Sequence, residues 1–210
     1  MYSSFLSYLK ESLQEGLVGE EAHQKMLPPG RQLKTHENEL SLVKPSSVLL
    51  LLFPEGEQLF VCLIKRPSTM KHHPGQISFP GGKVEKEDVS VEMTALREAR
   101  EEVGIDPAYV RIIGKLSELY VEVSKFLIHP FLAWADHKPD FLVNKAEVEE
   151  LILFPISDFV ANETIMETDL DTVTGRLRIR YYPFNSQIIW GATAMILSEL
   201  IEILKKYKVV

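Results

Sequence analysis

Residues 79–105 read FPGGKVEKEDVSVEMTALREAREEVGI, in which a glycine-rich loop leads into a helical pattern rich in acids. At about 100° per residue, a helix groups three carboxylates on one face, namely Glu98, Glu101 and Glu102, and three apolar side chains on another, namely Leu96, Ala99 and Val103. We expect the acids to face away from the core, where they repel one another unless a cation lies among them. Such hard oxygen ligands suit Mg²⁺ or Mn²⁺. The alternative is a solvated acidic face.

Glycine and proline flank this helix on both sides. Gly81 and Gly82 permit a tight turn and a close approach of the backbone to a ligand. Gly104 suits a helix C-cap, and Pro107 prevents the helix from running on. The segment therefore predicts a glycine-rich loop, a helix over residues 90–103 and a glycine stop.

This arrangement resembles the Nudix box, Gly-x5-Glu-x7-Arg-Glu-U-x-Glu-Glu-x-Gly-U, where U is aliphatic. Residues 97–105 match its second half apart from one small residue at an aliphatic position, and Gly82 matches its first glycine. Val89 stands where the box has its first acid, and Asp88 lies one residue earlier. The resemblance implies that Asp88 helps to hold Arg97 and the loop in place.

A second resemblance lies upstream, where residues 61–82 read VCLIKRPSTMKHHPGQISFPGG. They are similar to the additional signature of the coenzyme A pyrophosphatase branch of the Nudix family. The positions that match in register are Arg66, Gly75, Phe79, Pro80, Gly81 and Gly82. The positions that depart are Ile64, Pro67 and Lys71, which replace Thr, Ser or Ala, and Arg. The resemblance to the branch covers about residues 45–205, including its final helix at residues 190–194.

Arg66 and Lys71 lie on the loop that distinguishes this branch, and we hypothesise that both contact substrate phosphates. A polyanionic substrate needs local positive charge in an otherwise acidic protein. Lys71 keeps the charge of arginine but lacks its planar, bidentate fork. The alternative is that both side chains are solvated, or that Arg66 pairs with a nearby acid.

The resemblance also implies a mechanism, in which divalent ions assist water in cleaving a phosphoric anhydride. The implied ligands of Mg²⁺ or Mn²⁺ are the carboxylates of Glu98, Glu101 and Glu102, with the carbonyl of Gly81. Arg97 belongs to the same catalytic set, and we expect it to pair with an acid of the box as structural support.

The general base is left open between two regions. Glu98 sometimes has this role in the family, whereas other members take the base from a later loop. The run NKAEVEEL offers Glu147, Glu149 and Glu150 there. An acidic run before a strand is more often a solvated edge, so we assign none of them.

The resemblance implies hydrolysis of coenzyme A or acyl-coenzyme A to 3′,5′-ADP and 4′-phosphopantetheine or its acyl form. One alternative is another nucleotide substrate, such as ADP-ribose or an oxidised nucleoside triphosphate. A different class is a ligand sensor with the Nudix fold that has lost catalysis, but all three box glutamates are present. A helical metal site outside the family would need acids on four helices, and the many apolar strand-like runs disfavour it.

Composition places the chain among ordinary globular proteins, with 210 residues, of which 45% are hydrophobic and 25% charged. A net charge of −7 disfavours a nucleic-acid partner. The single cysteine, Cys62, excludes an intramolecular disulfide and lies in an apolar run typical of a core. We find neither a leader with a basic start nor an apolar run of about 18 residues, so we expect no membrane span and a cytoplasmic location.

Hydrophobic periodicity predicts an alternation of helices and strands along the chain. The expected helices cover residues 5–22, 90–103 and 188–205. The expected strands cover residues 47–53, 58–65, 109–113, 126–133, 148–154 and 176–182. This order predicts the α/β fold that the resemblance implies, an α/β/α sandwich with a mixed β-sheet between helices.

We expect one globular unit, with an N-terminal helix and wrapping segment over residues 1–44 and a Nudix hydrolase domain over residues 45–210. The helix has an apolar stripe of Phe5, Leu9, Leu13 and Leu17. This stripe packs on its own domain or forms the interface of a homodimer, which is a common state among Nudix enzymes.

Overall fold

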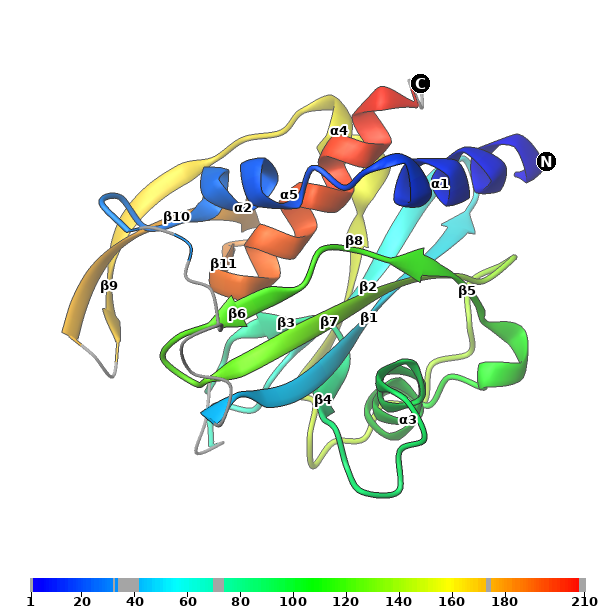
Figure 1. Cartoon of the computed structure of the whole chain (residues 1–210), viewed down its shortest axis with the longest axis horizontal. Helices are drawn as coiled ribbons and strands as arrows, with labels where there is room; N and C mark the ends of the chain where they lie inside the picture. The colour runs from blue at the N-terminus through cyan, green and yellow to red at the C-terminus, as the bar shows by residue number, and fades with distance from the viewer. Residues whose placement is uncertain (1, 32, 34–41, 70–73, 173–174, 208–210) are drawn as a thin grey trace.

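The computed structural model describes residues 2–31, 33, 42–69, 74–172 and 175–207. In this part of the chain, a mixed eight-stranded sheet forms the centre of the molecule (Figure 1). Its strands are β1 (Lys44–Glu55), β2 (Gln58–Lys65), β3 (Ile77–Ser78), β4 (Gly81–Lys83), β5 (Arg111–Lys115), β6 (Leu119–Val121), β7 (Phe126–Trp134) and β8 (Glu150–Pro155). The path β3-β2-β1-β7-β5 is joined by β4 on β1, β6 on β7 and β8 on β2. The pair β1 and β7 is parallel and the others are antiparallel, which confirms the predicted mixed sheet.

Helices cover both faces of this sheet (Figure 1). They are α1 (Ser3–Glu15), α2 (Gly19–Met26), α3 (Val91–Val103), α4 (Ile156–Ala161) and α5 (Gly191–Lys206). Side chains alternate along β1, so Leu50 and Leu52 join the core under α1 and α5, whereas Leu49 and Leu51 join the core under α3. The two cores confirm the predicted α/β/α sandwich.

The N-terminal extension packs on its own domain. Phe5 and Leu9 are buried, and the Phe5 ring contacts Trp134 at a centroid distance of 5.8 Å. The prediction of one helix over residues 5–22 is wrong, because Gly16 has a φ of 135° and separates α1 from α2. The apolar stripe is therefore covered largely within the chain, which removes the main argument for placing it in a dimer interface.

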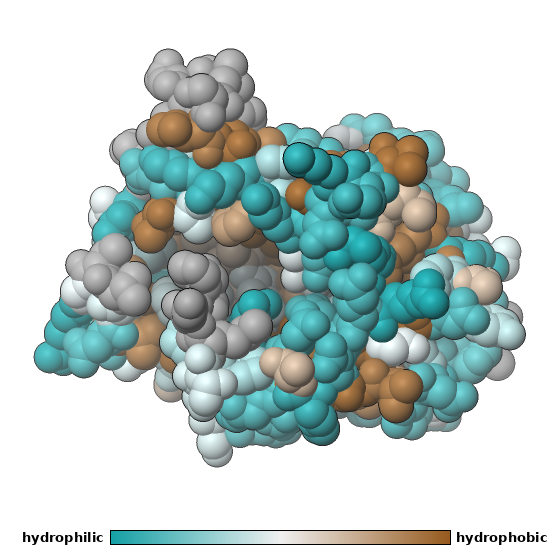
Figure 2. All heavy atoms as spheres, turned by 90° about the horizontal axis from the view of Figure 1, so that it is seen from below, coloured by the Kyte–Doolittle hydropathy of each residue, from teal (hydrophilic) through white to brown (hydrophobic). Residues whose placement is uncertain are grey.

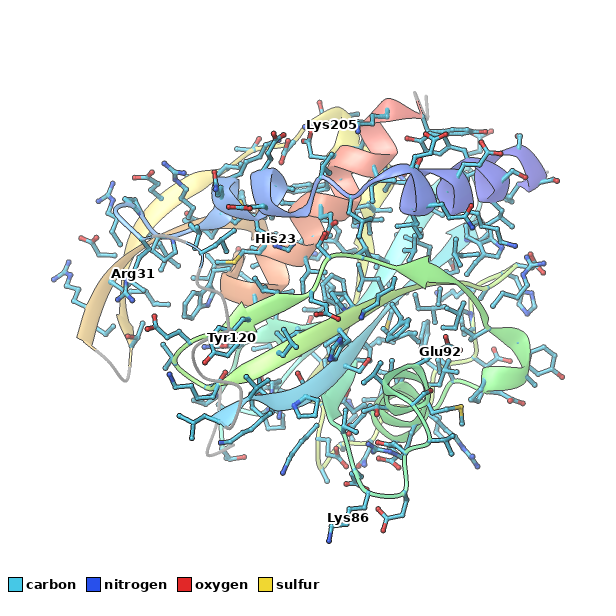
Figure 3. All side chains as sticks on the ribbon, viewed as in Figure 1. His23, Arg31, Lys86, Glu92, Tyr120 and Lys205 are labelled. Carbon is cyan, nitrogen blue, oxygen red and sulfur yellow. The ribbon has the colours of Figure 1, made fainter. Side chains whose placement is uncertain are left out.

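A buried polar contact fixes α2 on α5. His23 lies between these helices (Figure 3), and its Nε2 is 3.3 Å from a carboxylate oxygen of Glu199. Glu199 also accepts a hydrogen bond of 2.7 Å from the Ser117 hydroxyl. Gly19 lies against this contact, since a Cβ there would stand 1.9 Å from Ser117 Oγ. The extension thus joins the domain through a tightly packed polar cluster.

A second, three-stranded sheet extends away from the centre (Figure 1). It contains β9 (Met166–Thr172), β10 (Gly175–Phe184) and β11 (Gln187–Trp190). Sequence reasoning missed β9 and β11, and it began the last helix too early, because residues 187–190 pair with β10 before α5 starts. The missed signal was the alternation in METDLDT, whose acids face the arginines of β10 across the strands.

Several smaller differences concern boundaries. The strand expected at residues 109–113 is displaced, because residues 107–109 form a 3₁₀ turn and β5 starts at Arg111. The short strands β3, β4 and β6 and the helix α4 were not predicted, since each has at most six residues and little periodicity. Among the described helices, none combines the length and the hydropathy that a membrane span requires.

Candidate active site

Helix α3 presents the acid cluster, and its sequence explains both of its ends. Ser90 caps the N-terminus by accepting a hydrogen bond of 3.2 Å from the Met93 amide. Gly104 ends the helix in the left-handed conformation, with a φ of 72°. Ala99 and Val103 are fully buried against the sheet. These local signals are why the predicted helix over residues 90–103 closely matches α3.

Two glycines bring the preceding loop against the sheet and the helix. A Cβ on Gly81 would stand 2.3 Å from the Ser47 carbonyl, and its φ is 156°. A Cβ on Gly82 would stand 2.4 Å from the Glu98 carboxylate. The backbone contact of Gly81 requires glycine, whereas a side chain at Gly82 would displace the Glu98 carboxylate. The loop that follows runs outward, and Lys86 points into solvent there (Figure 3).

Arg97 makes most of the polar side-chain contacts between α3 and this loop. It makes two hydrogen bonds to the Asp88 carboxylate, 2.9 Å from Nε and 3.0 Å from Nη2. Asp88 also accepts from the Thr94 hydroxyl at 2.8 Å and from the Glu85 amide at 2.9 Å. The hydrogen bonds from Arg97 hold the pKa of Asp88 well below its usual range. These contacts agree with Arg97 as structural support and with Asp88 as the acid that holds it.

Glu98 and Glu101 also lie against Arg97. The Nη1 atom of Arg97 is 2.9 Å from Glu98 and 3.1 Å from Glu101. Glu98 is partly buried, and burial raises its pKa, whereas half of the Glu101 side chain is exposed. The guanidinium therefore neutralises part of the negative charge on this face of α3.

Glu102 departs from the expectation that all three acids face away from the core. It is 2% exposed, and one of its oxygens accepts a hydrogen bond of 2.9 Å from the Gly81 amide. Burial raises its pKa to about 8, and the charge of Glu98 adds to the effect. The expectation is wrong for Glu102 because strand β4 covers this side of the helix.

The predicted metal ligands are not grouped around one common point in the described part of the chain. Within the described residues, no three Asp, Glu, His or Cys side chains gather into a ready metal site. The donor set nevertheless fits a divalent cation, since it consists of carboxylates and lies beside a glycine-rich backbone. Burial is the main reason that the pKa of Glu102 is raised, and a cation beside the carboxylate would favour its charged form.

The loop residues proposed to bind substrate have different outcomes. The structure places Arg66 beside the acids, with its Nη1 atom 3.8 Å from Glu102. Lys71 lies outside the described residues. Arg66 therefore lies at the candidate site and within ion-pair distance of an acid, which is the alternative given for this residue, and its contact with a substrate phosphate stays a prediction.

Glu147 lies near this site, although sequence reasoning assigned it no role. Burial is the main cause of the raised pKa values of Glu98 and Glu102, and the charge of Glu147 adds to the effect. Asn144 positions it, since the Asn144 side chain donates to Glu147 at 3.0 Å and the Asn144 amide donates to the Glu102 carbonyl at 2.9 Å. The sequence signal was the acidic run NKAEVEEL, which alone does not distinguish Glu147 from its neighbours.

The neighbouring acids have other partners. Glu149 pairs with Lys65 at 2.8 Å and accepts from the Ser68 amide at 3.2 Å. Glu150 accepts a hydrogen bond of 3.0 Å from Gln187. The face of the molecule seen in Figure 2 is largely hydrophilic, with scattered apolar side chains between the polar ones.

Sequence comparison identifies relatives over most of the chain. The NUDIX domain matches residues 43–174. A protein from Pectobacterium atrosepticum named Uncharacterized Nudix hydrolase NudL is 32% identical over 177 residues, which cover 84% of this chain and 88% of the relative. Nudix hydrolase 15, mitochondrial, from Arabidopsis thaliana is 35% identical over 164 residues, which cover 73% of this chain and 56% of that protein.

Solved structures show the same fold at lower identity. RenU, a Nudix hydrolase from M. Smegmatis, has a TM-score of 0.54 and 18% identity, with 78% of this chain and 86% of that chain covered. The NUDIX domain of Shewanella oneidensis NrtR, solved with ADP ribose, has a TM-score of 0.54 and 17% identity, with coverage of 77% and 88%. The sequence match and the fold agree, and the chain belongs to the NUDIX domain family of hydrolases.

Proposed function

We propose that the protein is a Mg²⁺- or Mn²⁺-dependent diphosphatase of coenzyme A or acyl-coenzyme A. The observation that carries the proposal is the position of Arg66, the cation of the second signature, beside Glu102 of the box. Arg66 follows the end of β2 and Glu102 lies on α3, so the fold brings a residue of the signature beside a residue of the box. The products are 3′,5′-ADP and 4′-phosphopantetheine, or its acyl form.

In this proposal the acids of α3 hold the cation. Glu98, Glu101 and Glu102 are the side-chain ligands, and the Gly81 carbonyl is a backbone ligand. A bound Mg²⁺ or Mn²⁺ neutralises charge on the phosphate oxygens and activates water for attack. A cation bound there would also reduce the electrostatic repulsion between the neighbouring carboxylates of α3.

Other residues of the chain bind and position. Arg66 neutralises charge on the diphosphate, and Arg97 holds Glu98 and Glu101 on one side of the helix. Asp88 in turn fixes Arg97. Glu98 and Glu147 are the two candidates for the base that takes a proton from water, because Glu98 lies on the acidic face of α3 and Asn144 links Glu147 to the end of that helix.

A substrate panel tests the proposal. The purified protein is incubated with coenzyme A, acetyl-coenzyme A, ADP-ribose, NADH and a dinucleoside polyphosphate, with Mg²⁺ and with Mn²⁺ separately. We expect coenzyme A or its acetyl form to give the highest kcat/KM, with 3′,5′-ADP identified by mass spectrometry. Preferred cleavage of ADP-ribose would overturn the coenzyme A assignment but leave the hydrolase chemistry standing. Binding of these ligands without any cleavage would favour a sensor.

The domain organisation is proposed in the same way. We infer that residues 1–44 form an extension that stabilises one hydrolase domain over residues 45–210. The contacts of Phe5 with Trp134 and of His23 with Glu199 support this inference, because they join the extension to the sheet and to α5.

A further inference from the structure

Two buried polar atoms at the edge of the candidate site have no hydrogen-bond partner in the described part of the chain. They are the hydroxyl oxygen of Ser78 and the Nε atom of Arg66. Buried polar groups in folded proteins are nearly always hydrogen-bonded, and an unpaired one costs folding free energy. Two such donors from neighbouring elements are therefore available to a further hydrogen-bond acceptor.

The strand pairing places both residues on the α3 side of the sheet. Ser78 stands opposite Ile64 in the antiparallel pair of β3 and β2, and opposite residues point to the same face. Ile64 belongs to the core under α3, so the Ser78 side chain lies on that face as well. Arg66 follows two positions after Ile64, and its guanidinium lies near Glu102 on the same face.

The backbone around these two residues is held firmly. The Arg66 amide donates to the Gln76 carbonyl at 3.0 Å, which closes the loop onto β3. The buried hydroxyl of Thr193, on α5, donates to the Ile77 carbonyl at 2.9 Å. The unpaired atoms therefore belong to an anchored segment.

The chemistry of these two atoms determines which kind of group can form hydrogen bonds with them. An arginine Nε–H donates only, and a serine hydroxyl can donate, so the partner must accept hydrogen bonds. Glu102 does not serve, because its oxygen is 3.8 Å from Arg66 Nη1, beyond hydrogen-bond distance. The permanent positive charge of the guanidinium favours an anionic oxygen as this acceptor.

We propose that Ser78 Oγ and Arg66 Nε donate together to a non-bridging oxygen of the substrate diphosphate. Ser78 is then a substrate-binding residue that recognises the diphosphate itself. This inference rests on the proposed diphosphatase function. The competing occupant is a structural water, which commonly satisfies buried polar groups.

The test is calorimetric titration of ADP, a diphosphate ligand, in the presence of Mg²⁺, into the wild type and Ser78→Ala. We expect Ser78→Ala to weaken ADP binding by about tenfold, since a hydrogen bond to a charged group is lost. The melting temperature of the ligand-free protein should stay equal or rise, because an unpaired buried hydroxyl is removed. Ser198→Ala is the matched control, since its fully buried hydroxyl lies on α5. It should leave the ADP affinity unchanged.

The outcomes separate this inference from the proposed function. The inference is overturned if the wild type hydrolyses a diphosphate substrate but Ser78→Ala binds ADP with a dissociation constant within twofold of the wild-type value. The Ser78 hydroxyl then binds a water molecule or has no partner. If the wild type neither binds ADP nor hydrolyses any member of the substrate panel, the proposed function fails first. Ser78→Cys, which keeps the volume but offers only a weak donor, repeats the measurement should Ser78→Ala fold poorly.

Discussion

Asp88→Asn is the most informative change to the scaffold of the site. The substitution keeps the size of the side chain but removes the charge that faces Arg97. The Asp88 side chain is 5% exposed, that of Arg97 is 23% exposed, and two hydrogen bonds of 2.9 and 3.0 Å join them. Breaking a fully buried pair costs about 3–5 kcal/mol, so a partly exposed pair that keeps some hydrogen bonding should lose about 2–3 kcal/mol.

A thermal melt in metal-free buffer measures this loss. A chain of this size loses about 2–4 °C per kcal/mol, so we expect Asp88→Asn to melt about 4–12 °C below the wild type. Glu55→Gln is the control, because Glu55 pairs with Lys138 on the surface, and its loss should stay below about 1 kcal/mol. A melting temperature for Asp88→Asn equal to that of the control would refute the reasoning.

The same pair predicts a pH dependence with a definite sign. The pKa of Asp88 is lower in the folded protein than its ordinary value of about 3.9. Its stabilising contribution is therefore present above that ordinary value and is lost as the pH falls toward the depressed pKa. The stability difference between the wild type and Asp88→Asn should shrink below about pH 4, and a constant difference down to pH 2 would contradict this assignment.

Three further predictions concern the extension, the substrate and the assembly. Gly19→Ala should destabilise the protein by about 1–3 kcal/mol in chemical denaturation, because its Cβ meets Ser117, and adding Ser117→Gly should restore part of the loss. Lys71→Ala should raise KM for coenzyme A with little change in kcat, and more strongly than for dephospho-coenzyme A if Lys71 binds the 3′-phosphate; equal effects on both substrates would place it elsewhere. The homodimer stays a prediction that light scattering at micromolar concentration decides, and a monomer of 23.9 kDa would contradict it.

Local signals made α3 and its glycines predictable from the sequence. Ser90 and Gly104 mark the two ends of the helix, and Ala99 and Val103 mark its buried face. By the same logic, the apolar runs at residues 47–53 and 58–65 predicted two strands, which the structure pairs as β1 and β2. These features depend on residues close together in the chain, which is where propensity and periodicity are informative.

Features that depend on distant packing were not predictable in this way. Helical geometry grouped Glu102 with Glu98 and Glu101, but burial by β4 gives Glu102 a different environment. The proximity of Glu147 to the acids depends on how Asn144 bonds to the end of α3. The polar alternation of β9 was overlooked because its apolar face is short and its partner strand follows it.

The chemistry at α3 is tested most directly by coenzyme A hydrolysis at limiting Mn²⁺ with the wild type, Glu101→Gln and Glu102→Gln. Each change keeps the size of the side chain and removes one charged ligand, so turnover should fall by at least about tenfold, since metal charge stabilisation is worth several kcal/mol. Melting curves and circular dichroism of both variants should show a folded protein. Near-normal turnover in both variants at limiting metal would contradict the assignment of these acids as metal ligands.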